Sequence, residues 1–144
     1  MHFLFAVFVS IIFALLEIQI EGDHGWAKNL PTWKINNPLK KITHWPHITG
    51  YHVYMFSLLF ILLHFPYFLG LEPTYKNELT ILQTYFLIIT FEDFLWFVFN
   101  PKWGLKNFFK NTIKWHPKRV LKLPIPYWVS LVVIVFLQSL HEIK

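Results

Sequence analysis

Two adjacent carboxylates, Glu92 and Asp93, stand inside a run from Thr90 to Asn100 that is otherwise apolar and aromatic. Each acid near the centre of a spanning helix costs about 2.5–3.5 kcal/mol to insert, whereas each Leu, Ile, Phe or Val returns only about 0.3–0.6 kcal/mol. Ionisable groups at such a depth usually face an interior or a watery cavity and find partners there. We therefore predict that Glu92 and Asp93 belong to a functional site and that other segments supply their partners.

Further acids and histidines are predicted to lie near the depth of Glu92 and Asp93 in the membrane. They lie at the end of the first apolar run, at the start of the second and after the third: Glu17, Glu21, His24, His52 and His116. Carboxylates and neutral imidazoles are suitable ligands for Zn²⁺, Fe²⁺ or Mn²⁺. Glu21 and His24 also have the Glu-x-x-His spacing found in di-iron helical bundles. The sequence predicts a divalent metal site with ligands drawn from Glu17, Glu21, His24, His52, Glu92 and His116.

A metal at this depth implies a kind of chemistry. The ion would neutralise the acids and lower the pKa of a bound water towards neutrality. Glu92 and Asp93 are the predicted catalytic residues, with Asp93 acting as a general base or holding a metal-ligating histidine in place. Hydrolysis or hydration is favoured over oxygen chemistry, because Zn²⁺ needs fewer ligands than a di-iron centre. The leading hypothesis is a metal-dependent, membrane-embedded hydrolase or related enzyme that acts on a lipid-like substrate.

Two other functions remain open at this point. In the first, the protein is a non-enzymatic assembly or accessory subunit of a membrane complex, and its acids pair with basic groups of a neighbour. In the second, it is an oligomer that conducts ions or protons along Glu78, Glu92 and Asp93. A single chain with four helices would need to form such a homo-oligomer to enclose the path.

Several classes of site are excluded by missing residues. The chain has no cysteine, so any metal must be held by histidine and carboxylate rather than by thiolates. No Gly-x-Ser-x-Gly, P-loop or dinucleotide motif occurs, and we expect neither a nucleotide nor haem. The eight histidines are too scattered to form the histidine boxes of a membrane desaturase. The formal charge of +5 resides in loops without a groove-reading motif, so no nucleic-acid partner is expected.

The elements that must position these residues are four apolar runs, at 3–20, 48–70, 78–99 and 126–141. Each run is long enough, or nearly so, to cross a bilayer as a helix. The chain is 55% hydrophobic and 20% aromatic, which is typical of membrane proteins with aromatic belts. We predict one domain over residues 1–144: an all-α integral membrane protein with four transmembrane helices in an antiparallel bundle.

One face of the first run carries small and polar residues. Ser10, Ala14, Glu17 and Glu21 recur at helical spacing, and the face reaches His24 if the helix continues past Gly22.

The two long connections, 21–47 and 101–124, are rich in tryptophan and lysine and are predicted to lie at the lipid headgroups. These two segments carry eleven Lys and Arg residues, whereas the short connection between them carries one. The positive-inside rule then predicts that both long loops are cytoplasmic and both termini are outside, in the inner or plasma membrane of the cell. The lipid bilayer is the partner that these features predict directly.

Overall fold

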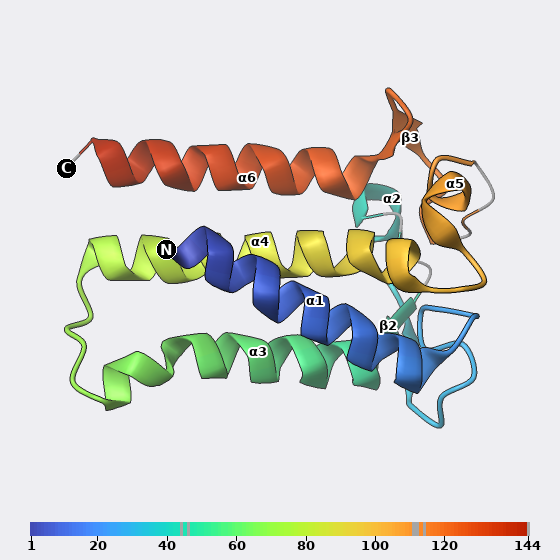
Figure 1. Cartoon of the computed structure of the whole chain (residues 1–144), viewed down its shortest axis with the longest axis horizontal. Coiled ribbons are helices and arrows are strands. Elements are labelled where there is room, and N and C mark those ends of the chain that lie inside the picture. The colour runs from blue at the N-terminus through green and yellow to red at the C-terminus, as the bar shows by residue number, and fades with distance from the viewer. Residues whose placement is uncertain (44, 46, 111–112, 114, 144) are drawn as a thin grey trace.

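Four long helices dominate the computed structural model, which describes residues 1–43, 45, 47–110, 113 and 115–143 (Figure 1). They are α1 (His2–Glu21), α3 (Gly50–Phe68), α4 (Tyr75–Phe99) and α6 (Ile125–Glu142). Each is long and apolar enough to cross a membrane. The helical class and the four helices of spanning length are therefore confirmed. Two short helices, α2 (Lys40–Thr43) and α5 (Gly104–Phe108), lie in the long connections.

Local sequence signals explain where the long helices begin and end. α1 stops at Glu21 because Gly22 adopts a positive φ of 68° and its N–H bonds back to Ile18. Thr49 caps the start of α3 with its side chain, and Thr74 caps α4 in the same way. The end of α1 decides the position of His24, which follows the helix instead of extending its buried face.

α4 is the central element, and the other long helices are arranged around it (Figure 1). α1 and α6 pack along α4, and α3 also contacts it. Ala6, Ser10 and Ala14 are fully buried on α1, where small side chains allow close backbone approach. The Ser10 hydroxyl lies 2.7 Å from the Ala6 carbonyl oxygen and 3.1 Å from that of Ile88 on α4. The small and polar face predicted for the first helix is thus the face that packs against the core.

Both long connections lie at the same end of the helices, and both chain termini lie toward the opposite end (Figure 1). The first connection contains β1 (Lys34–Asn36), paired antiparallel with β2 (His47–Thr49). The second contains the pair β3 (Arg119–Val120) and β4 (Leu123–Pro124). The sequence predicts loops in both segments and gives no sign of these strands, which are too short for a period-two pattern to show.

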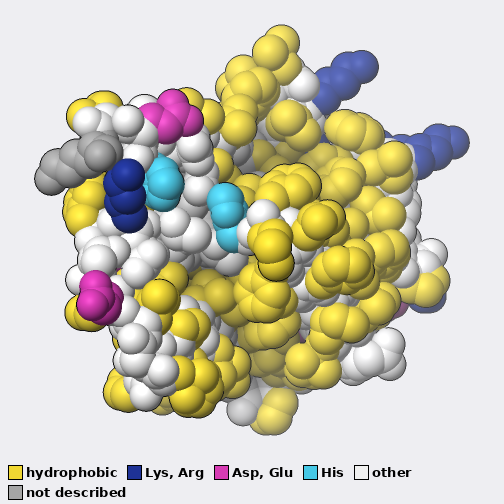
Figure 2. All heavy atoms as spheres, turned by 60° about the vertical axis from the view of Figure 1, so that its left-hand side comes forward, with side chains coloured by type: hydrophobic (Ala, Val, Ile, Leu, Met, Phe, Trp, Pro, Cys, Tyr) yellow, Lys and Arg dark blue, Asp and Glu magenta, His cyan; other side chains and the backbone are white. Residues whose placement is uncertain are grey.

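An aromatic cluster joins the second connection to the helix ends. Phe97 and Phe108 are fully buried, and Trp96 and Trp115 nearly so, around Ala14 of α1. The sides of the helices are different, because large apolar side chains are exposed along them. Figure 2 shows hydrophobic side chains covering most of one face, with charged side chains at its margins. Four apolar helices with such exposed faces suit a membrane protein.

Candidate metal centre

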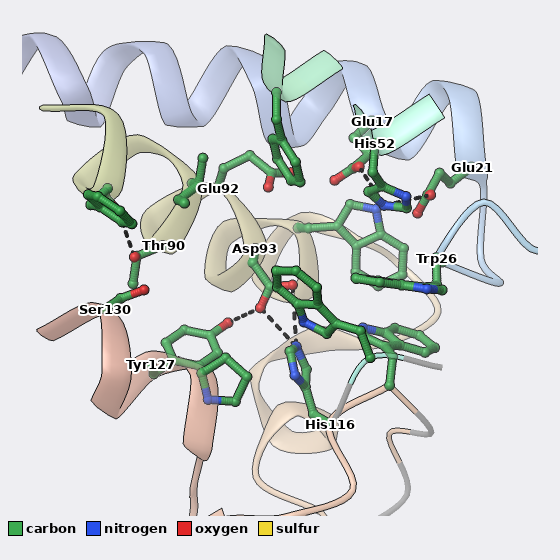
Figure 3. Close-up of a pocket in the computed structure, with 18 of the residues that line it drawn as sticks. Glu17, Glu21, Trp26, His52, Thr90, Glu92, Asp93, His116, Tyr127 and Ser130 are labelled. Carbon is green, nitrogen blue, oxygen red and sulfur yellow. Dashed lines mark hydrogen bonds and ion pairs between the residues drawn. The ribbon is translucent and has the colours of Figure 1, made fainter. Parts of the chain in front are cut away.

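A cavity of about 390 Å³ lies at the loop end of the helices (Figure 3). It is lined by α1, α3, α4, α6 and both long connections, and its volume falls in the usual range of ligand pockets. The structure brings most of the predicted site residues to its wall: Glu17, Glu21, His52, Glu92, Asp93 and His116. Residues from four separate segments, namely α1, α3, α4 and the second connection, thus meet at one place.

Three of these residues could hold a metal ion. Glu17, Glu21 and His52 are buried, and each offers a ligand atom within 4.8 Å of the others. His52 Nε2 lies 3.8 Å from Glu17 Oε1 and 3.6 Å from Glu21 Oε1, too far for hydrogen bonds. A tetrahedral ion with bonds of about 2.1 Å holds its ligand atoms about 3.4 Å apart. Both distances from His52 Nε2 to the carboxylates are therefore within about 0.4 Å of the spacing that such an ion requires.

The other nitrogen of His52 is held by Thr49. Nδ1 lies 2.6 Å from Thr49 Oγ1, which also accepts the backbone N–H of His52 at 3.3 Å. We assign the proton to Nδ1, since Oγ1 can accept from both groups, and this leaves the lone pair of Nε2 facing the two carboxylates. Trp26 stacks on the imidazole at 4.5 Å between ring centroids. Such support for the second ring nitrogen is usual for metal-ligating histidines.

Replacing Thr49 with valine is expected to weaken metal binding by about 10–100-fold, because His52 loses the partner that orients it. The measurement is the dissociation constant for Zn²⁺, obtained by competition with a chromophoric chelator. Thr74→Val is the matched control, since Thr74 caps α4 through Asn77 in the same way but bonds no histidine. Both variants lose a helix cap worth about 1 kcal/mol. Equal affinities in the two variants would contradict the role of Thr49.

The segment after α1 wraps around Glu21. The backbone N–H of Ala27 donates to Glu21 Oε1. Gly25, Trp26 and Ala27 all have positive φ, at 59°, 53° and 49°, and successive turns of this kind direct backbone N–H groups at an anion. A Cβ on Gly25 would lie 2.8 Å from the ring of Trp115, so only glycine fits there. The loop thereby fixes one carboxylate of the group that could hold an ion.

Asp93 and His116 form a second group across the cavity (Figure 3). His116 Nε2 lies 3.0 and 3.3 Å from the two carboxylate oxygens of Asp93, and the Tyr127 hydroxyl donates to the same carboxylate. Asp93 thus has a histidine and a tyrosine as partners. His116, predicted as a metal ligand, is not part of the group that could hold an ion, because the second connection brings it to Asp93 instead.

Glu92 is 4% exposed, and its carboxyl group shares a hydrogen bond with that of Glu17. Its Oε1 has no hydrogen-bond partner among the residues that the structure describes. Within the same described part, no Lys or Arg forms an ion pair with Glu17, Glu21, Glu92 or Asp93. The site is consequently rich in carboxylates, and histidines are their only ion-pair partners among the described residues.

The structure does not bring His24 into the site. Its Nδ1 lies 2.5 Å from Asp23 Oδ1, and its side chain is 43% exposed. The Glu-x-x-His interpretation required a continuous helix, and α1 ends before His24 because of Gly22. Glu78 is also remote: it lies 3.2 Å from His64 Nε2, and about 21 Å along α4 from Glu92 at 1.5 Å per residue.

Sequence reasoning missed three residues of the site. Thr49 could have been found, because a threonine before a predicted helix start is a typical N-cap. Tyr127 and Trp26 carried no comparable signal, since each reaches the site from another segment. Comparisons with protein-family models, with curated proteins and with solved structures find no match to this chain.

Proposed function

We propose that the chain is an antiparallel four-helix integral membrane protein that binds a divalent metal ion through Glu17, Glu21 and His52. The ion serves hydrolytic chemistry on a lipid-like substrate in the adjoining cavity. One observation carries the proposal: three buried side chains from two helices converge, with Nε2 of His52 facing two carboxylates while its Nδ1 contacts Thr49. Three protein ligands with an open fourth position are the arrangement of catalytic zinc sites.

Charge balance supports an ion at this position. Burying an ionised carboxylate without a partner is costly, and this site gathers four carboxylates without a Lys or Arg ion pair among the described residues. A divalent cation would offset two of the negative charges at once. Bound cations are often the largest local charges in such sites.

The remaining groups have roles in the same chemistry. An ion held by Glu17, Glu21 and His52 would activate a bound water, and Glu92 would accept the proton of that water as its oxygen attacks an acyl carbon of the substrate. The carbon–oxygen bond of the ester then breaks, and the proton passes to the departing alkoxide, giving an acid and an alcohol. His116, oriented by Asp93, lies across the cavity as a second group able to move that proton.

The distribution of charge supports an orientation. The two connections that surround the site carry eleven of the thirteen Lys and Arg residues. Under the positive-inside rule these loops are cytoplasmic and both termini are outside. The cavity then opens at the level of the inner leaflet, where a lipid-like substrate is available.

Elemental analysis of the purified protein tests the proposal. The protein is expressed with added zinc, iron or manganese, purified in detergent and checked for helical content. We expect close to one equivalent of one of these metals per chain, and its removal by a chelator to abolish ester hydrolysis. Folded protein without stoichiometric metal would overturn the proposal. It would instead favour an accessory subunit whose acids pair with a neighbouring chain.

A further inference from the structure

The cavity extends well beyond the metal group. Its wall follows α4 from Asp93 back to Tyr85, which is about 12 Å at 1.5 Å per residue. This deeper part is lined mainly by apolar and aromatic side chains, with Phe56 contributed by α3 and Ser130 by α6. The space is therefore long and mainly apolar, and it has the metal group and the second acid–histidine group at one end (Figure 3).

Polar atoms at that end lack partners. Trp96 Nε1, Glu92 Oε1 and His116 Nδ1 are buried and have no hydrogen-bond partner among the described residues. All three residues line the cavity and are at most 4% exposed. Buried polar atoms without partners are rare in folded proteins, and each asks for an explanation such as a bound group.

The chemistry of these atoms defines the group that would satisfy them. An indole N–H only donates, whereas an ionised carboxylate only accepts. His116 Nδ1 also accepts, because Nε2 is the nitrogen that donates to Asp93. A ligand that offers both an acceptor and a donor, as one hydroxyl group does, can therefore satisfy the indole N–H and one of the two acceptors.

The negative charge of the nearby carboxylates favours a lipid with an uncharged head group. A fatty-acid carboxylate or a phosphate would add a negative charge beside Glu92 and Asp93, and like charges at short distance repel. An uncharged hydroxyl avoids this repulsion and can donate to Glu92 while it accepts from Trp96. A hydrocarbon would leave all three polar atoms without partners.

We propose that this cavity binds a single-chain lipid with an uncharged hydroxyl head group, that is, a long-chain alcohol. The hydroxyl lies between Glu92 and Trp96, and the chain lies along α4 between α3 and α6. The proposal rests on the proposed function in that this alcohol is the part of a long-chain ester that hydrolysis in the same cavity would release. It does not require the metal ion to be present.

Three probes with related eighteen-carbon chains test the head group: oleyl alcohol, oleate and octadecene. An equimolar mixture is added to the detergent-purified protein, which is then re-isolated by affinity chromatography, and the retained lipids are quantified by mass spectrometry. We expect wild type to enrich the alcohol about tenfold over each of the others, since 1.4 kcal/mol of hydrogen bonding corresponds to that factor. Equal retention of the three probes, or a preference for oleate, would overturn the proposal.

Substitutions that fill the cavity test whether the lipid binds there. Ser130→Trp and Thr90→Phe fill the cavity from different helices, and both are expected to abolish the enrichment, whereas Val132→Trp on the exposed face of α6 preserves it. Trp96→Phe keeps the ring but removes the N–H, and should lower the preference for alcohol over octadecene at least threefold. Trp103→Phe is its control, because Trp103 Nε1 already donates to the Asp23 carbonyl oxygen. Retained enrichment in well-folded cavity-filling variants would refute the assignment.

The same measurements on chelator-treated protein separate the two proposals. Metal-free wild type that still enriches the alcohol supports the lipid site even if elemental analysis finds no stoichiometric metal. Protein that binds metal but retains the three probes equally refutes the lipid site alone.

Discussion

Replacing His52 with glutamine is expected to lower the affinity of the protein for Zn²⁺ by more than about 100-fold. Loss of a group that merely supports a ligand typically costs 10–100-fold, and His52 contributes the only nitrogen of the proposed ligand set. The dissociation constant is measured by chelator competition in detergent. His64→Gln is the matched control, because His64 lies on the same helix and pairs with Glu78 away from the metal group. Similar affinities in these two variants would rule out His52 as a ligand.

Replacing Glu17 or Glu21 with glutamine should also lower the affinity of the protein for Zn²⁺. Glu17→Gln and Glu21→Gln each remove a charged ligand, while Glu78→Gln removes a carboxylate of α4 that lies outside the group. Thermal unfolding gives an independent measurement, because a ligand at 100 times its dissociation constant stabilises the folded state by about 2.7 kcal/mol. Zinc should raise the melting temperature of wild type and of Glu78→Gln, and should leave the two ligand variants unchanged.

Replacing Phe97 with alanine is expected to destabilise the protein by about 3–5 kcal/mol, the usual cost of deleting a buried phenylalanine ring. Phe97 is fully buried, and its ring contacts those of Trp103, Phe108 and Trp115 within 6.0 Å between centroids. The cavity left behind would lie beneath the connection that carries His116. Unfolding in mixed micelles, followed by tryptophan fluorescence and helical circular dichroism, measures the change.

Phe8→Ala is the control for Phe97→Ala. Phe8 is 67% exposed on α1 and belongs to no buried cluster among the described residues. Its removal should change the free energy of unfolding by much less than the loss of Phe97. A small effect at Phe97 would mean that the aromatic cluster does not hold the second connection against the helices.

Periodicity and hydropathy predicted the features that each helix determines by itself, namely its extent and its buried face. The four apolar runs became helices, and the spacing of Ser10, Ala14, Glu17 and Glu21 predicted the buried face of α1. The reason is physical: a helix in an apolar environment satisfies its own backbone, so its extent and its polar face can be read from local sequence.

The connections could not be predicted in this way. A single glycine, Gly22, ended α1 and removed His24 from the face, although the spacing alone allowed it to stay. His116 met Asp93 because an aromatic cluster folds the second connection back over the helices. Such contacts depend on segments far apart in the chain, and the sequence carries no local pattern that reports them. A shared depth in the membrane suggested which residues are near one another, but not which side chains face each other.

The pairing of α1 with α4 also sets an order of events during synthesis. Ser10 contacts Ile88, 78 residues later in the chain, and a ribosome that adds 5–20 residues per second takes about 4–16 s to cover that distance. Glu17, Glu21 and His52, by contrast, have all been made before the first residue of α4. A nascent chain therefore contains all three residues of the proposed ligand set while Asp93, His116 and Tyr127 are still unmade. The ion could thus be captured first, and the walls of the cavity would then assemble around it.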